Sequence, residues 1–581
     1  MKQAVGFGAA GLVVLAVLTY GIGTGSPLIP RWMVVYGAAV LTLGLLAFAL
    51  CKNTTITLLR SELLVLVFIG YLALSLVWSS DPRDGLLTVE AVFVLWLLYV
   101  GLTRLPRAQL VGATYVGATI ALGGATVFGF AYPLIYGGVG NENFQAEMFL
   151  VLLPLVIAAW VAIKTPVAWL RWFALPATLA ALYFILFVNL SDSKWVAASA
   201  GLLAVVVWLG RRKRYTAAGF AVLVPLNVAI LSGWATSSVV VKAIIHRLEI
   251  GLNSALLWAE RPLLGHGLGS FNYEYGRFQE AHLRFFPEMD TVLRPSSVFA
   301  GAAHNELLQL GADAGLIGLL LGLSLIGALI WRFITKRKDA ADIGAGMALL
   351  VAAGLSQISF PLQNPATLTI VVFAAAVLMQ GERPVLRLAV PRLQSIALCG
   401  VLCAGGIGLA YSASLSYRAE RLFKDTRANI EIAHPAALQA NLDAHKLYPY
   451  DRRYRHQLML TVGALLKNAH GNVVITKEAA DRAYRISQSA AAHMPAIKLT
   501  RLEYLLNTER WREERAEVEE LLVWLKQHAR LQPGVWLAEG SYAVRTGNVE
   551  RLLRALDAGG KLPTRTHDEG FRVLASYLKV N

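Results

Sequence analysis

Thirteen stretches of this 581-residue chain are apolar over about the 20 residues that an α-helix needs to cross a bilayer. So many stretches of this kind predict a polytopic membrane protein. They lie near residues 4–23, 32–51, 62–79, 86–103, 109–131, 146–163, 172–190, 195–210, 215–235, 307–331, 341–359, 364–380 and 394–415. No small-residue cleavage site follows the first stretch, so we expect it to be retained as a helix.

Charged residues divide the chain into two parts. Residues 1–416 hold 27 Lys and Arg and 18 Asp and Glu, whereas the much shorter 417–581 hold 26 and 19. We therefore predict a transmembrane domain over 1–416, with a large external loop at 237–306, and a soluble domain over 417–581. Helical spacing of apolar residues predicts an all-helical soluble domain. A tetratricopeptide-like stack and an irregular bundle are both open, since no clean period of about 34 residues appears.

Basic residues indicate one orientation of the helices. With a cytoplasmic N-terminus, 18 Lys and Arg fall on inner segments and three, Arg31, Arg83 and Lys194, fall on short outer loops. The turns near 141–143, 191–194 and 360–364, the loop 237–306 and the soluble domain then share the outer face. The net charge of +16 is explained by inner loops, and no Lys/Arg stripe suggests nucleic acid.

The chain carries three cysteines, all in or beside apolar runs. A disulfide scaffold or a zinc site is not expected from Cys51, Cys399 and Cys403, because three cysteines are too few and their apolar surroundings predict that they are buried. No Asp-x-Asp pair or cluster of histidines and carboxylates is evident. We therefore expect chemistry that needs neither a metal ion nor a cofactor.

The loop 237–306 is far longer than a connector requires, which is typical of a functional or disordered segment. Its cations are arginines and histidines: Arg247, Arg261, Arg277, Arg284, Arg294, His246, His266, His282 and His304. Arginine binds phosphate through a bidentate fork, so these side chains are candidates for holding a phosphorylated ligand. The alternatives are contacts with lipid headgroups for the arginines and structural roles for the histidines.

Three local patterns stand on the predicted outer face. Residues 261–271, Arg-Pro-Leu-Leu-Gly-His-Gly-Leu-Gly-Ser-Phe, suggest a tight backbone beside a helix end. They are no dinucleotide fingerprint, because no strand or βαβ unit surrounds them. Residues 303–318 begin Ala-His-Asn-Glu and place His304 where the loop enters a membrane helix. Residues 140–144, Gly-Asn-Glu-Asn-Phe, open another helix.

Over most of residues 60–380, the order and spacing of these patterns resemble the O-antigen ligase and polymerase superfamily of bacterial membrane glycosyltransferases. The resemblance implies an all-α, GT-C-like membrane protein of about 12–13 transmembrane helices in the bacterial inner membrane, with the soluble domain in the periplasm. It also implies that His304 is the general base and that Arg247 binds the pyrophosphate of a polyprenyl-linked glycan. Ser193-Lys194-Trp195 matches a family Ser-Arg pair, but Lys194 replaces the bidentate arginine with a point charge.

Further candidates complete the predicted site. For substrate binding they are Arg261, Arg284, Arg294, Asn141, Asn143 and His266; in supporting roles they are Asn305, Glu306 and Asp313. Glu306 could orient His304 or satisfy the amides of a helix start. Asp313 is an intramembrane acid, for which a functional role and a helix-packing hydrogen bond are both open, as for Glu90 and Glu147.

The expected reaction moves a glycan from undecaprenyl diphosphate to an acceptor hydroxyl with inversion. An imidazole suits the role of base at neutral pH, and fixed cations suit a leaving pyrophosphate. Lipid A–core as acceptor would make a ligase, as in lipopolysaccharide assembly. Another lipid-linked glycan would make a polymerase, and a protein hydroxyl an O-oligosaccharyltransferase, although the Gln-x-Asn-His pattern expected of that branch is absent at 141–144.

Two rivals come from other classes of protein. A transporter or flippase for the same lipid-linked sugar fits the many helices, but no inverted repeat is visible and the polar features crowd one face. A scaffold whose soluble domain recognises a protein partner leaves the Arg/His loop unexplained.

Overall fold

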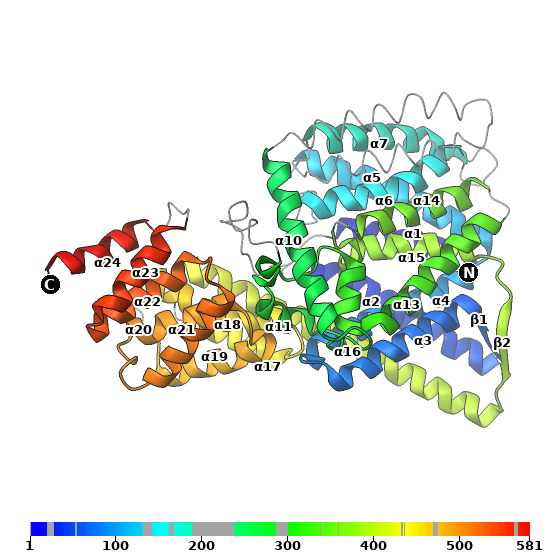
Figure 1. The fold of residues 1–581 in the computed structure, drawn as a ribbon. Coiled ribbons are helices and arrows are strands. Elements are labelled where there is room, and N and C mark those ends of the chain that lie inside the picture. The colour runs from blue at the N-terminus through cyan, green and yellow to red at the C-terminus, as the bar shows by residue number, and fades with distance from the viewer. Residues whose placement is uncertain are drawn as a thin grey trace.

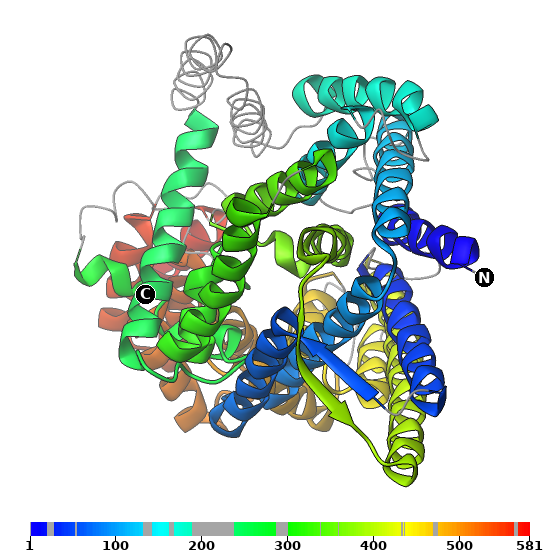
Figure 2. The same cartoon turned by 90° about the vertical axis from the view of Figure 1, so that its right-hand side faces the viewer.

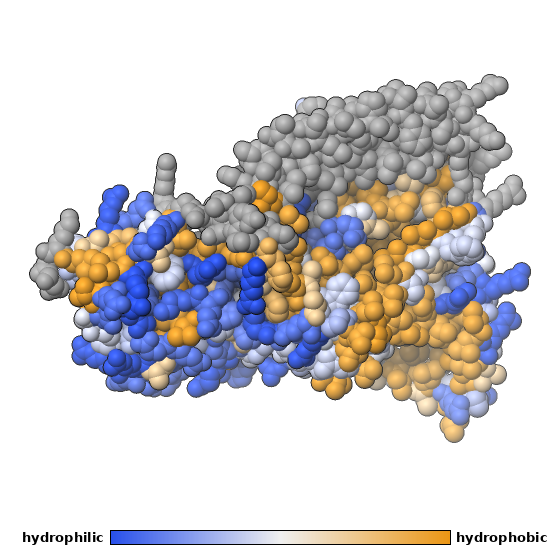
Figure 3. Space-filling view, viewed as in Figure 1, coloured by the Kyte–Doolittle hydropathy of each residue, from blue (hydrophilic) through white to orange (hydrophobic). Residues whose placement is uncertain are grey.

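The computed structural model describes residues 2–19, 28–52, 55–131, 142–161, 168–188, 238–285, 300–336, 339–357, 359–431, 434, 436–468, 475–562 and 568–580. Apart from one pair of short strands, these residues form helices and the turns between them. A bundle of apolar helices occupies one half of the molecule and a stack of shorter, polar helices the other (Figure 1). In Figure 3 apolar residues predominate on the coloured part of the bundle and hydrophilic residues on the stack.

The bundle helices coincide with eleven of the thirteen predicted stretches. They are α1 (Lys2–Leu18), α2 (Leu28–Lys52), α3 (Arg60–Ser75), α4 (Pro82–Thr103), α5 (Arg107–Ala131), α6 (Glu142–Val161), α7 (Arg171–Tyr183), α13 (Glu306–Thr335), α14 (Ala340–Leu355), α15 (Pro365–Met379) and α16 (Arg392–Glu431). Among the described residues, seven helices are long and apolar enough to cross a membrane, and four are shorter. The prediction of an all-helical, multi-pass membrane protein is confirmed. The stretches 195–210 and 215–235 lie outside the described residues.

Several bundle helices begin at a side-chain cap. Asp81 accepts a hydrogen bond from the Asp84 amide and Pro82 follows at the first helical position of α4. Asn364 caps α15 in the same way, with Pro365 next. An N-cap acceptor satisfies amides that have no partner within the helix, and proline at the first position loses no hydrogen bond. These starts lie at the end of the bundle that faces the helix stack.

The other end of the bundle carries the only strands in the described part of the chain. β1 (Thr55–Leu59) pairs antiparallel with β2 (Pro384–Ala389), with Thr57 opposite Arg387. In Figure 2 these strands lie nearest the viewer, and the helix stack lies behind the bundle. Arg107, beside this end, forms ion pairs with Asp339 and Asp342. The segments near 55–59, 104–107, 339–342 and 384–389, all predicted to be cytoplasmic, thus gather here, while the orientation in a membrane stays a prediction.

Helix α15 runs through the centre of the bundle. It packs against α1, α2, α4, α5, α6, α13 and α14. Its side chains are buried on nearly every side, among them Thr369, Phe373 and Val377. A helix that is apolar all round is stable only inside a larger assembly of helices, so α15 forms the core around which the others are arranged.

The polar helices after α16 form the unit called here the tail. They are α17 (Ala436–Leu447), α18 (Arg452–Asn468), α19 (Lys477–Ala491), α20 (Pro495–Asn507), α21 (Arg515–His528), α22 (Pro533–Thr546), α23 (Val549–Gly560) and α24 (Asp568–Val580). Each packs on the next, and α16, α18, α20, α22 and α24 also pack on one another in series. This order is typical of stacked helical hairpins. Since α16 continues through residue 416, a helix leads from bundle to tail; the domain division and the tetratricopeptide interpretation stay predictions.

Candidate active site at the tail-facing end of the bundle

Three segments predicted to share one face meet around His304. The His304 ring lies 4.9 Å, centroid to centroid, from that of Phe360 in the turn between α14 and α15. Phe360 in turn lies 5.2 Å from Phe144 in the first turn of α6. The start of α6, the turn 356–364 and the loop before α13 are therefore side by side. The fourth predicted segment, 191–194, lies outside the described residues.

Arg247 joins this group from α10 (Ser238–Glu260), which packs against α13. Its charge acts on both His304 and Glu147, so the guanidinium lies in the neighbourhood of both side chains. His246, one residue earlier, also acts on His304 and lies 3.5 Å from the Glu249 carboxylate. The structure thus brings together the two residues to which the resemblance assigns base and pyrophosphate binding.

His304 has an unusual backbone conformation and a half-buried imidazole ring. Its φ of 52° is in the left-handed region, which a non-glycine residue occupies at a cost of about 1–3 kcal/mol. The half-buried ring has no hydrogen-bond partner at Nδ1 among the described residues. Burial, the Arg247 charge and His246 lower the pKa of His304 to about 4. The imidazole is therefore neutral at pH 7 and able to accept a proton.

Asn305 and Glu306 fasten the loop to the start of α13. Asn305 Oδ1 accepts hydrogen bonds of 3.0 Å from the amides of Leu307 and Leu308, and its Nδ2 donates to the Gln357 carbonyl. The Glu306 amide donates to the Ser356 carbonyl, and Glu306 Oε1 has no partner among the described residues. Asn305 is thus a helix cap that holds the His304 loop against the turn after α14.

Glu147, on α6, is fully buried beside this loop. Neither carboxylate oxygen makes a hydrogen bond to a described residue, although Ser359 lies next to it and Arg247 and Glu306 interact with it electrostatically. The sequence marks Glu147 only as an acid within an apolar stretch. Its place beside Arg247 depends on packing between segments 100 residues apart. We define the His304 cluster as His304, Arg247, Glu147, Glu306 and Phe360.

The glycine-rich run 261–271 lies against a break in α13. Gly315 has φ 65° and ψ −170°, which interrupts the helix and exposes backbone carbonyls. The His266 amide donates to the Ala312 carbonyl at 2.9 Å and the Gly267 amide to the Asp313 carbonyl at 2.7 Å. Gly267 has φ 92°, and a Cβ there would overlap Ser79. Glycine is required because two backbones touch at this point.

His266 and Asp313 take part in this contact through their side chains. His266 is 1% exposed, its Nε2 lies 3.0 Å from the Leu257 carbonyl, and burial lowers its pKa. Asp313 Oδ1 accepts a 2.8 Å hydrogen bond from the Phe271 amide, at the start of the short helix α11 (Phe271–Glu274). Both side chains thus hold the glycine-rich run to the broken helix, and His266 faces no open space.

The remaining candidates are spread more widely. Arg261 and Arg284 are exposed, Arg261 beside the glycine-rich run and Arg284 in the turn Ala281–Arg284. Asn143 is half-buried in the first turn of α6, next to Phe144. Lys194, Arg294 and Asn141 lie outside the described residues.

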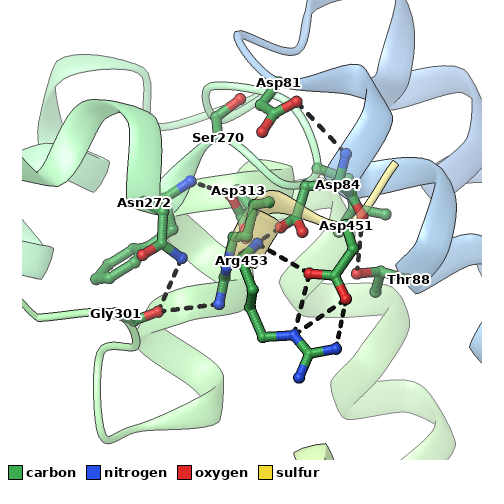
Figure 4. Close-up of polar contacts among 12 residues, drawn as sticks. Asp81, Asp84, Thr88, Ser270, Asn272, Gly301, Asp313, Asp451 and Arg453 are labelled. Atoms are coloured by element: carbon green, nitrogen blue, oxygen red, sulfur yellow. Dashed lines mark hydrogen bonds and ion pairs between the residues drawn. The ribbon is translucent and has the colours of Figure 1, made fainter. Parts of the chain in front are cut away.

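The tail contacts this end of the bundle through two ion pairs, one of them buried, beside a third pair within the tail. Arg455 on α18 donates to both carboxylate oxygens of Asp81, at 3.0 and 2.8 Å, and both side chains are at most 3% exposed. Arg452 donates to Asp84 at 3.0 Å, and Arg453 pairs with Asp451 (Figure 4). We call this group the tail junction. The sequence singles out none of these residues, since arginines at a helix start are usually solvated.

Three further contacts fasten the tail to the loop between α10 and α13. Glu280 Oε1 accepts a 3.0 Å hydrogen bond from the Leu531 amide. The carbonyl of His493 lies so close to Gly276 that a Cβ there would overlap it. Arg452 Nη2 also donates to the Gly301 carbonyl, three residues before His304. The tail therefore supports the loop that carries His304.

A cavity of about 720 Å³ opens between the bundle helices and the tail junction. Its wall includes Glu306 of the His304 cluster and Asp84 and Arg452 of the junction. Among the described residues, no three His, Cys, Asp or Glu side chains are placed to hold a metal ion. Metal independence stays a prediction.

Comparison with known proteins adds one family. The family model described as O-Antigen ligase matches residues 176–323, 148 of the 581 residues. The match spans Arg247, the glycine-rich run, His304 and the break at Gly315, which are the parts that the structure brings together. No curated protein matches the chain. With the helical, multi-pass membrane fold, the match supports the resemblance of this chain to the O-antigen ligase and polymerase superfamily.

Proposed function

We propose that the chain is a glycosyltransferase that moves a glycan from undecaprenyl diphosphate to an acceptor hydroxyl at the periplasmic face of the inner membrane. One observation carries this proposal: His304, strained in its backbone and with no hydrogen-bond partner at Nδ1 among the described residues, lies where the Arg247 charge acts on it. Strained residues with unsatisfied polar atoms concentrate at functional sites. The family match covers both residues.

In the proposed reaction His304 removes the proton of the acceptor hydroxyl as its oxygen attacks the anomeric carbon. The bond from that carbon to the phosphate oxygen breaks, and undecaprenyl diphosphate leaves with the bonding electrons and an added negative charge. Arg247 stabilises this charge by charge-assisted hydrogen bonds. The attack comes from the face opposite the leaving group, so the anomeric configuration inverts.

The pKa of His304 fits this role once the donor is bound. In the free protein burial and the Arg247 charge keep the imidazole neutral. A bound diphosphate neutralises Arg247, which removes a charge that opposes protonation and raises the basicity of His304. The base therefore becomes stronger when the donor is in place.

The proposed transfer has three versions, which differ in the acceptor molecule. We favour ligase activity, with lipid A–core as acceptor. A polymerase would use another lipid-linked glycan, and an O-oligosaccharyltransferase a protein hydroxyl, with the tail as the surface that recognises a protein.

The test compares His304→Ala and Arg247→Ala with His434→Ala and Arg418→Gln, exposed controls on the tail side. Surface glycan, lipid-linked precursor and membrane levels of the protein are measured in cells. Loss of surface glycan with accumulation of precursor in the first two variants supports transfer. Accumulated single repeat units indicate a polymerase, and accumulated full-length glycan a ligase. Normal surface glycan from both variants would refute the catalytic assignment.

A further inference from the structure

One turn of α10 brings a second histidine to the His304 cluster. The Cβ position of Gly251 on α10 lies 3.8 Å from Leu308 Cδ1 on α13, and contacts further along the two helices continue in the same direction. Four residues before Gly251 is Arg247, and four residues before Leu308 is His304. The turn that carries His246 and Arg247 therefore lies beside His304, which agrees with the electrostatic effect of both residues on that ring.

His246 differs from His304 in its partner. Its Nδ1 lies 3.5 Å from Glu249 Oε2, one helical turn further along α10. The Glu249 side chain is 2% exposed, and this is the one ion pair that it makes among the described residues. The His246 side chain is 31% exposed, so the ring lies between a buried carboxylate and the surface of the helix. Because the carboxylate is on the Nδ1 side, Nε2 is left to meet another partner.

Buried residues around Glu249 hold the carboxylate in place. Asn253, one turn after Glu249, donates a 2.8 Å hydrogen bond to the Gln279 carbonyl and accepts one of 3.0 Å from the His282 amide. Tyr275 and His282 are at most 1% exposed, and the Glu249 charge acts on both. A buried carboxylate that fixes one ring nitrogen is the usual device for orienting a catalytic imidazole.

The two histidines have opposite electrostatic surroundings. A guanidinium disfavours a protonated imidazole and a carboxylate favours one. Arg247 acts on His304, whereas Glu249 lies at ion-pair distance from His246. Two neighbouring rings repel each other when both are protonated, so a single proton is shared between them. Neighbouring titratable groups with such different surroundings are typical of the acid and the base of one reaction.

We propose that His246 is the acid of the transfer reaction and that Glu249 positions it. As the bond from the anomeric carbon to the diphosphate oxygen breaks, that oxygen takes the bonding electrons and the proton of His246 Nε2. His304 takes the proton of the acceptor hydroxyl in the same step, so the total charge of the site is unchanged. The proton then returns from His304 to His246. This inference rests on the proposed function and adds to Arg247 a second group that neutralises the leaving diphosphate.

The test compares two synthetic donors with the full chain in nanodiscs. Both carry the innermost sugars of the lipid-linked precursor from wild-type cells on undecaprenyl diphosphate, one through the usual anomeric oxygen and one through sulfur in its place. Sulfur leaves as a weaker base than oxygen and does not need an acid. His246→Gln should therefore lower transfer from the oxygen donor about a hundredfold or more and leave transfer from the sulfur donor nearly unchanged. Glu249→Gln should lower transfer from the oxygen donor about tenfold, with the same recovery on the sulfur donor.

A matched control is available in the tail. His528→Gln, at a half-buried histidine on α21, should transfer from both donors as wild type does. Equal loss from both donors in His246→Gln would make His246 a structural residue and overturn the proposal. Unchanged transfer from the oxygen donor in His246→Gln would overturn it as well.

Wild type gives a second reading that does not depend on the folding of any variant. Two protons move in the transfer step with the oxygen donor and one with the sulfur donor. Deuterium oxide should therefore slow single-turnover transfer from the oxygen donor more than transfer from the sulfur donor. Equal slowing of the two would contradict an acid at the leaving oxygen.

His304→Ala separates this inference from the proposed function. It should lose transfer from both donors, because the acceptor hydroxyl needs a base whichever atom leaves. Transfer by His304→Ala at the wild-type rate would refute the base, and the donor dependence of His246→Gln would still decide whether His246 is the acid.

Discussion

Two polar clusters at the same end of the bundle differ in how many of their charged groups form hydrogen bonds. In the tail junction, Asp81, Asp84 and Asp451 each face an arginine at hydrogen-bond distance. In the His304 cluster, Nδ1 of His304, both oxygens of Glu147 and Oε1 of Glu306 make no hydrogen bond to a described residue. The Arg452 contact with Gly301 links the clusters, so they belong to one continuous structure.

This difference distinguishes residues that stabilise the fold from residues that are needed for the transfer reaction. A buried polar atom without a partner costs about 1–3 kcal/mol, and folded proteins keep few of them unless a ligand is to supply the partner. Paired junction residues are expected to stabilise the fold and to affect transfer only through it. In the His304 cluster, the side chains of His304, Glu147 and Glu306 have atoms without a hydrogen bond to a described residue. These side chains are expected to destabilise the fold and to be needed for transfer. Each prediction below tests one side of this comparison.

The largest change in folding free energy is expected at the tail junction. Arg455→Ala leaves Asp81 buried without its cation, which typically costs about 3–5 kcal/mol of folding free energy. Thermal unfolding of the purified protein and proteolytic release of the tail measure it. Asp81→Ala combined with Arg455→Ala should cost clearly less than the sum of the single variants, because no charge is then left unpaired. Additive costs would show that the pair does not act as a unit.

In the His304 cluster, removing a charged side chain is expected to stabilise the fold. Glu147→Met fills a similar volume and removes two buried oxygens that lie near Ser359 but lack hydrogen-bond geometry to any described residue. The change should therefore raise the free energy of unfolding by about 1–3 kcal/mol and lower transfer. The same thermal measurement applies, together with the cellular glycan assay. Glu539→Met, at a tail carboxylate paired with Arg551 and Lys526, is the matched control and should destabilise. A destabilised Glu147→Met would remove the distinction between the clusters.

Arg247→Lys keeps the charge and removes the planar fork. If Arg247 binds a diphosphate through two parallel hydrogen bonds, the change should raise KM for the donor about tenfold and leave kcat less affected. Kinetics with a lipid-diphosphate glycan donor measures this split. An unchanged KM would place the diphosphate elsewhere.

The smallest effect is expected in the pH profile. A base with a pKa of about 4 in the free protein stays neutral at pH 5.5, where an ordinary histidine of pKa about 6.5 would be about 90% protonated. The acid limb of kcat/KM should therefore lie near pH 4, and Arg247→Gln should move it upward by removing one cause of the lowered pKa. A limb at pH 6.5 that Arg247→Gln leaves in place would contradict the role of His304.

Much of the molecule can be read from local sequence. Eleven apolar stretches became helices at the expected places because about 20 apolar residues in a row have few other stable states in a membrane. Asp81, Asn305 and Asn364 are recognisable caps, since capping acts within three residues. The glycines at 265, 267 and 269 also predict a tight backbone, because their conformational freedom is a property of each residue by itself.

Tertiary structure decided which of these polar residues meet. Arg247 acts on Glu147 across 100 residues of chain, and Arg455 reaches Asp81 across 374, although neither pair has a local signature. His266 and His304 look alike in the sequence, yet packing buries His266 against the Leu257 carbonyl and leaves Nδ1 of His304 without a partner among the described residues. Hydropathy and capping depend on near neighbours and are therefore written in the sequence, whereas the partner of a buried charge depends on how distant helices pack.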